Sequence, residues 1–239
     1  MIKVLEDLAG RGHVESMNAL GICYFVGDCV KDQTRAFELF ERAATKGDTA
    51  AMVNVGTCFE RGEGVAQDTA KAFQWYSRAA ENGDAVAENC LGLCYEDGIG
   101  VEKDMKMAFE WYTKGANDGY SSAMCNIGIC YENGKGVTRD MTQAFEWYMK
   151  AAENGSESAM NAVGICYDRG DGVTEDKNKV FEWFLKAANN GCGVAMYNVG
   201  ICLKNGKGVA QDIEQSFDWF LKADQNGCPN RLYLRSWCH

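Results

Sequence analysis

Cysteine is the first residue type in this sequence whose number and spacing suggest chemistry, with 12 in 239 residues. Clustered cysteines typically form disulfides, bind zinc or act as reactive thiols. Six of these recur at intervals of about 36 residues. They are Cys23, Cys58, Cys94, Cys130, Cys166 and Cys202. Each use places its own demand on geometry, so the spacing can distinguish among them.

The spacing argues against both disulfides and zinc. If the six lie on equivalent helices of neighbouring repeats, those helices are about 8–10 Å apart, whereas a disulfide needs Cα atoms within about 7 Å. A structural zinc site needs four ligands, yet there is no Cys-x-x-Cys pair, and His13 and His239 lie near opposite ends. We therefore expect buried, reduced thiols, no cofactor or metal, and a cytoplasmic location. A secretory location is the alternative if the chain is part of a longer precursor.

No other set of residues has the pattern of a catalytic site. With only two histidines in the chain, a Ser/His/Asp triad is not expected. The Gly-x-Gly segments lack the preceding strand of a phosphate-binding loop. Acidic and basic residues four apart, such as Glu110 and Lys114, predict solvated ion pairs along a helix. A further acidic column, which we also expect to be solvated, comprises Glu60, Glu96, Glu132 and Asp168. The sequence favours a protein that is not an enzyme.

Composition excludes several classes of protein and partner. With 46% hydrophobic residues and one proline, the chain is neither disordered nor collagen-like. A net charge of −10 disfavours nucleic acid, and no apolar segment is long enough to insert into a membrane. The same charge favours a basic or polar peptide as partner.

An internal repeat of about 36 residues accounts for the glycine content. A central glycine column is preceded by another glycine nine residues earlier and followed by a third six residues later. The central column is Gly21, Gly56, Gly92, Gly128, Gly164 and Gly200. Aspartate, phenylalanine and tryptophan columns keep the same period, as Asp68, Phe73 and Trp75 illustrate. In the first copy Leu39 replaces the tryptophan.

Each unit has the pattern of two helices. Residues 68–82 carry apolar side chains at helical spacing, with Asp68 as the expected N-cap and Gly83 as the helix-ending residue. We call this type the B helix. Residues 85–97, which end at Gly98, form the second type, the A helix. The sequence therefore predicts an all-α protein of stacked helical hairpins.

The central glycine lies inside the A helix, where glycine costs about 1 kcal/mol relative to alanine. A close contact would explain that cost, and we expect the tryptophan column of the B helix to supply the approaching side chain. Five alanines, each five residues before the central glycine, are expected to be further small packing contacts. They are Ala51, Ala87, Ala123, Ala159 and Ala195.

The combined pattern resembles the Sel-1-like repeat, a relative of the tetratricopeptide repeat. Residues 87–119 match it closely, including Leu91, Gly92, Tyr95 and Trp111. The resemblance implies a right-handed α/α superhelical solenoid of about six repeats. We expect a remnant helix over 1–12, the repeats over 13–227, and a divergent cap or truncated repeat over 228–239.

The resemblance also implies a non-enzymatic scaffold or adaptor that binds a protein or extended peptide. One cysteine-rich bacterial branch is linked to penicillin binding, and its paired cysteines bridge the A and B helices of one repeat. No B helix from Asp32 to Asn226 contains cysteine, so that pairing is absent. Penicillin-binding or β-lactamase-like activity, and a spacer segment of a larger protein, stay open as alternatives.

Tetratricopeptide-like solenoids present their A helices on the concave side, which is where we expect the partner. Asparagine recurs there, either two or three residues before the central glycine, in sets about 100° apart around the helix. These amides would clamp a peptide backbone, or else bond to the neighbouring repeat. The last residue of each A helix would line the same side. The candidate partner-binding residues are Asn54, Asn126, Asn198, Asn89, Asn161, Arg61, Asp97, Asn133, Arg169 and Asn205, with Asn18 in the first repeat.

Overall fold

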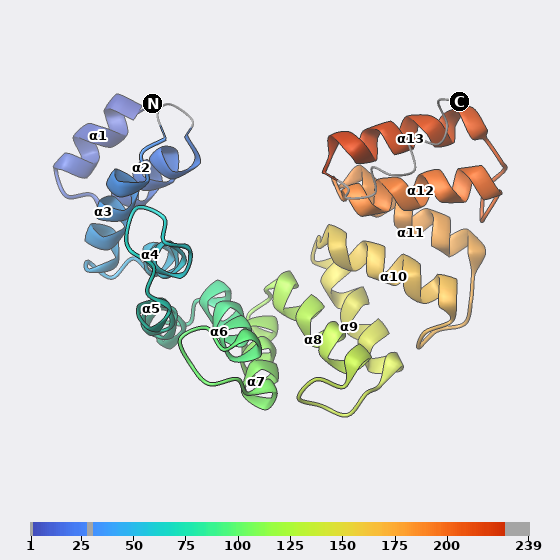
Figure 1. Cartoon of the computed structure of the whole chain (residues 1–239), viewed down its shortest axis with the longest axis horizontal. Coiled ribbons are helices and arrows are strands. Elements are labelled where there is room, and N and C mark those ends of the chain that lie inside the picture. The colour runs from blue at the N-terminus through green and yellow to red at the C-terminus, as the bar shows by residue number, and fades with distance from the viewer. Residues whose placement is uncertain (1, 28–30, 228–239) are drawn as a thin grey trace. The chain divides into compact units, whose positions relative to one another are not determined.

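The computed structural model describes residues 2–27 and 31–227, which form thirteen α-helices and no strand (Figure 1). Two types of helix alternate along the chain. The A helices are α2 (Val14–Val26), α4 (Thr49–Arg61), α6 (Ala85–Asp97), α8 (Ser121–Asn133), α10 (Glu157–Arg169) and α12 (Gly193–Asn205). The B helices are α1 (Ile2–Gly10), α3 (Gln33–Ala44), α5 (Thr69–Glu81), α7 (Met105–Asn117), α9 (Met141–Glu153), α11 (Lys177–Asn189) and α13 (Ile213–Gln225).

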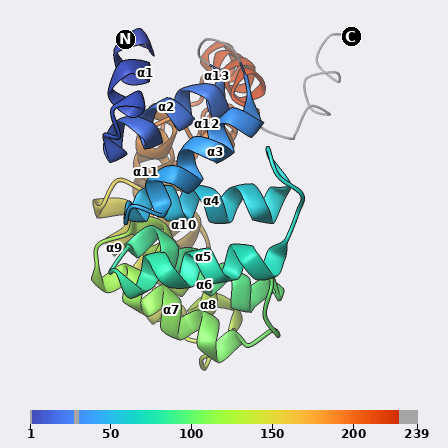
Figure 2. The ribbon, with the colours of Figure 1, turned by 90° about the vertical axis from the view of Figure 1, so that its left-hand side faces the viewer.

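The helices pack in two compact units, residues 1–118 and 119–239. Within each unit, every helix packs against the one before it and the one after it. Figure 2 shows this order from α1 to α7 in the first unit. Helix α1 precedes the first complete hairpin, at the place of the expected remnant helix. The expected cap over 228–239 lies outside the described residues.

The helix ends are formed as the sequence predicts. The aspartate column provides the N-caps of α3, α5, α7, α9, α11 and α13; Asp68 Oδ1, for example, accepts the Lys71 backbone N–H at 3.0 Å. Each described A helix ends at a left-handed glycine, such as Gly98 with φ of 76°, whose N–H donates to the Cys94 carbonyl. A residue with a Cβ would be strained in this conformation.

Each repeat has at its centre an aromatic ring that lies against the central glycine. A Cβ on Gly56 would lie 2.5 Å from Tyr76 Cε1, so only glycine fits. The same contact occurs in all six repeats, and the rings belong to Phe40, Tyr76, Tyr112, Tyr148, Phe184 and Phe220. The expectation of a close approach is thus confirmed, but its assignment to the tryptophan column is wrong. The ring comes from the next residue along the B helix.

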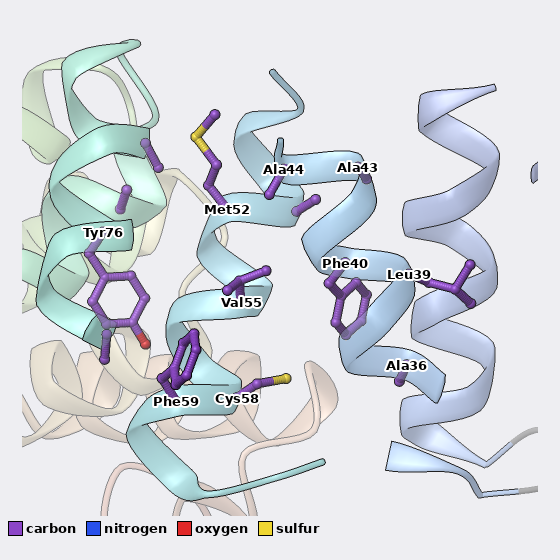
Figure 3. Close-up of a cluster of buried hydrophobic side chains, with 14 of the residues drawn as sticks. Ala36, Leu39, Phe40, Ala43, Ala44, Met52, Val55, Cys58, Phe59 and Tyr76 are labelled. Carbon is purple, nitrogen blue, oxygen red and sulfur yellow. The ribbon is translucent and has the colours of Figure 1, made fainter. Parts of the chain in front are cut away.

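Small and aliphatic side chains complete the core between the helices. Figure 3 shows Ala36, Phe40 and Ala43 on α3 beside Val55 and Cys58 on α4, all of them buried. The five A-helix alanines singled out in the sequence are 0% exposed, which confirms their packing role. Since this arrangement recurs in each repeat, the core runs along the stack rather than filling one centre.

The loops after α4, α6, α10 and α12 contact the preceding repeat. A Cβ on Gly64 would collide with the backbone carbonyl of Gln33, the first residue of α3. Gly100 meets Thr69 in the same way, and Gly172 and Gly208 meet Met141 and Lys177. These glycines therefore allow the loop to lie directly on the start of the previous B helix.

The tryptophan column has a different neighbour from the one predicted. In five B helices a basic side chain three residues later lies over the indole, as in Lys114 Nζ at 3.7 Å from the Trp111 ring centroid. The ion pairs expected four residues apart, such as Glu110–Lys114, do not form in the described part of the chain. The indoles are half-buried, and the negative electrostatic potential of the indole face attracts the cation in place of the carboxylate.

Replacement of Gly56 by alanine tests the ring contact. Alanine normally stabilises a helix relative to glycine by about 1 kcal/mol, but here we expect overpacking against Tyr76 to cost about 1–3 kcal/mol. Thermal and denaturant unfolding would measure the change. Gly10→Ala is the matched control, because its Cβ would meet no atom within 4 Å. Equal stability of the two variants would contradict the close contact.

A second prediction concerns Glu88 on α6, which is 7% exposed and whose Oε2 atom has no hydrogen-bond partner. Burial raises its pKa, the nearby Asp118 carboxylate raises it further, and Lys114 partly opposes them. Because the pKa is raised in the folded state, the contribution of Glu88 to stability is most favourable at acid pH and is lost as the pH rises through the folded-state pKa. We therefore expect Glu88→Gln to increase the Tm at pH 7, with the gain shrinking towards pH 4. A gain independent of pH would contradict this account.

Candidate functional site

The candidate residues on the A helices differ in accessibility. Asn54, Asn126 and Asn198 are half-buried, whereas Asn89 and Asn161 are 6% and 9% exposed. All five candidates at the helix ends are exposed: Arg61, Asp97, Asn133, Arg169 and Asn205. A partner can therefore reach the helix-end residues freely and the amide row only in part.

The two asparagine sets meet each other in pairs across neighbouring repeats. Asn54 Nδ2 donates to Asn18 Oδ1 at 2.8 Å, which joins α4 to α2 in the first unit. Asn198 Nδ2 donates to Asn161 Oδ1 at 2.9 Å, which joins α12 to α10 in the second. The different positions of the two sets around the helix thus bring each amide towards its neighbour. Bonding to the neighbouring repeat, one of the two uses expected from the sequence, occurs in both pairs.

The paired amides retain part of their hydrogen-bonding capacity. An asparagine side chain has two N–H donors and an oxygen that accepts two hydrogen bonds. In the first unit the Asn54 oxygen and the Asn18 NH₂ group take no part in the bond between the two amides. Each pair thus presents an acceptor and a donor side by side. A peptide backbone offers the complementary N–H and C=O groups.

The helix-end residues continue the amide row. Arg61 follows Asn54 by seven residues, which is about 20° short of two full helical turns. Asn133 and Asn205 have the same relation to Asn126 and Asn198. Asn133 Nδ2 also donates to the Ile129 carbonyl of its own helix at 3.0 Å. The exposed helix end and the amide therefore share one face on α4, α8 and α12. On α6 and α10 the helix-end residue follows the asparagine by eight residues, about 80° further around the helix.

An aliphatic row on the same face is absent from the residues selected by sequence. It consists of the residue directly after each central glycine, namely Ile22, Leu93, Ile129, Ile165 and Ile201, with Thr57 in the second repeat. Ile22 is 45% exposed and Leu93 38%, while the three isoleucines of the second unit are half-buried. The sequence does contain a signal for this row, because an isoleucine or leucine follows the central glycine in five of the six repeats. We call the amide, aliphatic and helix-end rows together the A-helix face.

The acidic column beside this face is engaged within the protein. Tyr76 and Tyr112 each donate their hydroxyl to the glutamate near the end of the preceding A helix, Glu60 and Glu96, at 2.7 Å. Tyr148 donates to Glu132 at 2.5 Å. Burial, together with the hydrogen bond to the carboxylate, raises the pKa of Tyr148. The expectation of simple solvation is wrong for these three carboxylates, which hold the ring against the glycine below it.

The cysteine column is part of the core. Of its six members all but the half-buried Cys23 are buried, and the nine described cysteines form no disulfide. Burial raises the pKa of Cys94 to about 12 and that of Cys202 to about 11, so these thiols are neutral at physiological pH. Among the described residues, no group of three or more His, Cys, Asp or Glu side chains could hold a metal ion. No helix in the described ranges is long and apolar enough to span a membrane.

Comparison with known proteins identifies the repeat. The Sel1 repeat family matches six consecutive segments, residues 14–48, 49–84, 85–120, 121–156, 157–192 and 193–227. The chain is a Sel1 repeat protein. Each matched segment contains one A helix and the B helix that follows it. The expected all-α Sel-1-like solenoid is confirmed, and Sel1 repeats are typically protein-interaction scaffolds.

Solved structures agree with this assignment. A Sel1 repeat protein from Oxalobacter formigenes is 30% identical, with a TM-score of 0.83 over 94% of this chain and 99% of that one. The protein c5321, a protective antigen of uropathogenic Escherichia coli with an SLR fold, is 36% identical, with a TM-score of 0.77 over 95% of this chain. The chain spans 49% of the length of c5321.

A more distant structure shares the fold. Immunity protein Pa5087 from Pseudomonas aeruginosa is 15% identical and has a TM-score of 0.66, with 91% of this chain and 83% of that one covered. At this sequence identity, the comparison shows a shared fold only. A search of curated proteins gave no match.

The Asn18–Asn54 pair provides a test of the amide arrangement. We expect Asn54→Ala to destabilise the protein by about 1 kcal/mol, because it removes a hydrogen bond and leaves the Asn18 amide without its partner. A double-mutant cycle with Asn18→Ala, measured by denaturant unfolding, should give a coupling energy of about 0.5–1.5 kcal/mol. Additive effects would show that the two amides do not interact in solution.

Proposed function

We propose that this Sel1 repeat protein is a non-enzymatic scaffold or adaptor that binds an extended segment of a partner protein along an A-helix face. The observation that carries the proposal is the combination of a solvent-accessible aliphatic row, exposed at Ile22 and Leu93 and half-buried in the second unit, with paired amides on the A helices. Apolar contacts supply affinity, and amides recognise a peptide backbone whatever its sequence. Both features occur in each unit: the aliphatic residues lie on α2 and α6 and on α8, α10 and α12, and the amide pairs join α2 to α4 and α10 to α12.

The spacing of the repeats sets the form of the ligand. Neighbouring packed helices lie about 8–10 Å apart, and an extended chain advances about 3.3 Å per residue. One A helix would therefore contact about every third residue of the partner. A segment that crosses three A helices would span about seven residues, with apolar side chains at the first, fourth and seventh.

Charge narrows the choice of partner further. The chain carries a net charge of −10, which disfavours an acidic segment over the whole surface. Locally the exposed helix ends are mixed, with Arg61 and Asp97 in the first unit and Arg169 in the second. The segment that suits both is neutral or basic overall, and apolar at every third position.

A peptide-binding experiment tests the proposal. Immobilised peptides of about ten residues would be screened with the intact chain, and affinities of binders measured by fluorescence polarisation. We expect the binders to have the three-residue apolar period, and we expect Ile201→Asp to weaken a peptide bound to the second unit at least tenfold, equivalent to about 1.4 kcal/mol. Asn198→Ala should weaken it less.

Glu182→Gln is the matched control, since Glu182 is exposed on the B helix α11. Unchanged Tm values would show that the variants remain folded. The proposal fails if no binder responds to changes on the A helices of either unit, or if bound peptides crosslink to the B helices instead.

A further inference from the structure

Five B helices contain an indole with a basic side chain over it. The pairs are Arg78 over Trp75 at 4.9 Å, Lys114 over Trp111 at 3.7 Å, Lys150 over Trp147 at 4.1 Å, Lys186 over Trp183 at 4.6 Å and Lys222 over Trp219 at 4.3 Å. In each pair the cation follows the tryptophan by three residues. The fold thus repeats one arrangement, an aromatic ring held beneath a cation.

The first repeat keeps the cation but lacks the ring. Leu39 occupies the tryptophan position of α3, and Arg42 follows it by three residues. The Arg42 side chain is exposed and has no ring, carboxylate or hydrogen-bond partner within the described ranges, and Glu38 on the same turn likewise has none for its carboxylate. The arrangement of the other five repeats is incomplete here.

A cavity of about 210 Å³ opens at this position. Its apolar wall is formed by Ala9 of α1, Leu20 of α2 and Leu39 of α3, all buried. A cavity of about 150 Å³ is sufficient to hold benzene. The space next to Leu39 is therefore large enough for a single aromatic side chain.

The orientation of α3 places this cavity on the tryptophan side of the helix. The Phe37 ring contacts Phe59 of the next repeat, with centroids 5.3 Å apart. Leu39 lies two residues further on, about 200° around the helix, and so faces the preceding helix α1. Figure 3 shows Leu39 pointing away from Val55 and Phe59 of α4. The side chain at this position in the other repeats is the indole.

The cavity rim determines which kind of ring fits. Two arginines and two glutamates surround it, Arg35, Arg42, Glu6 and Glu38, so their charges balance. Glu6 is already engaged, because it accepts the Tyr24 hydroxyl at 2.9 Å and lies 3.6 Å from Arg35. Arg42 is left to lie over a ring face, and Glu38 to accept an N–H or O–H from its edge.

We propose that this cavity between α1, α2 and α3 binds a tryptophan or tyrosine side chain of a partner protein, as a replacement for the tryptophan that the first repeat lacks. The ring occupies the cavity beside Leu39 with the Arg42 guanidinium over its face, and its polar edge donates to Glu38. This site is separate from the A-helix face, and the proposal does not depend on the function proposed above.

N-acetyl-L-tryptophanamide is the probe for a first test, titrated into the ¹⁵N-labelled intact chain and followed by NMR. We expect saturable shifts confined to residues around the cavity, with affinity in the millimolar range, and weaker binding of N-acetyl-L-leucinamide. Arg42→Gln should weaken the probe about threefold, as loss of one cation–π contact requires. Arg78→Gln, which removes a cation from a complete pair, should leave probe binding unchanged.

Leu39→Trp provides the second test, because it would fill the site from within. We expect it to abolish probe binding and to raise the Tm by about 2–4 °C. A lower Tm would show that the cavity cannot accept a ring, and unchanged probe binding to this variant would place the probe elsewhere. Either result overturns the proposal, as does the absence of saturable shifts in the unmodified chain.

Discussion

In each B helix from α3 onward, an aromatic ring lies directly on the backbone of the A helix of its repeat, at a position where a Cβ would collide with it. This contact fixes the distance between the two helices of a repeat, and it requires glycine in the middle of a helix despite the cost in helix stability. Much of the remaining structure follows from it. The buried alanines and cysteines are as small as the close approach demands. The hydroxyl of Tyr76, Tyr112 or Tyr148 holds the ring in place through a glutamate on the A helix.

The sequence was sufficient to predict the helix pair, its caps and the close approach at glycine, because each depends on residues near one another in the chain. It was not sufficient to choose between Trp75 and Tyr76 as the approaching ring. Both columns keep the same period, and adjacent residues point about 100° apart, so their order alone does not say which side faces inward. The Glu–Lys ion pairs failed for a related reason. A spacing of four residues favours an ion pair between glutamate and lysine, but it does not show whether another group attracts the lysine more strongly. Here the indole three residues before the lysine attracts the ammonium group.

The binding surface was predictable only in part. Asparagine inside a helix is unusual enough to be noticed, but the pairing of Asn54 with Asn18 joins residues 36 positions apart and depends on the stagger between helices. The aliphatic row escaped selection because isoleucine and leucine in a helix are ordinarily assigned to the core. Exposure of Ile22 and Leu93 becomes evident only when the packing of both helix types is known. The A-helix face is therefore formed by side chains of the A helices that do not pack into the core of their repeat.

The loop glycines have a consequence for how such proteins change in length. In four repeats the loop after the A helix packs on the first turn of the previous B helix, at Gly64, Gly100, Gly172 and Gly208. The conformation of a loop in one repeat therefore depends on the helix of the repeat before it. An inserted or deleted residue in that loop would displace the glycine from the carbonyl against which it lies. Whole repeats, in contrast, carry both halves of the contact with them. Duplication and loss of entire repeats are therefore the low-cost routes by which the array can grow or shrink, and a recombination point within a loop is compatible with the fold only when it preserves this register.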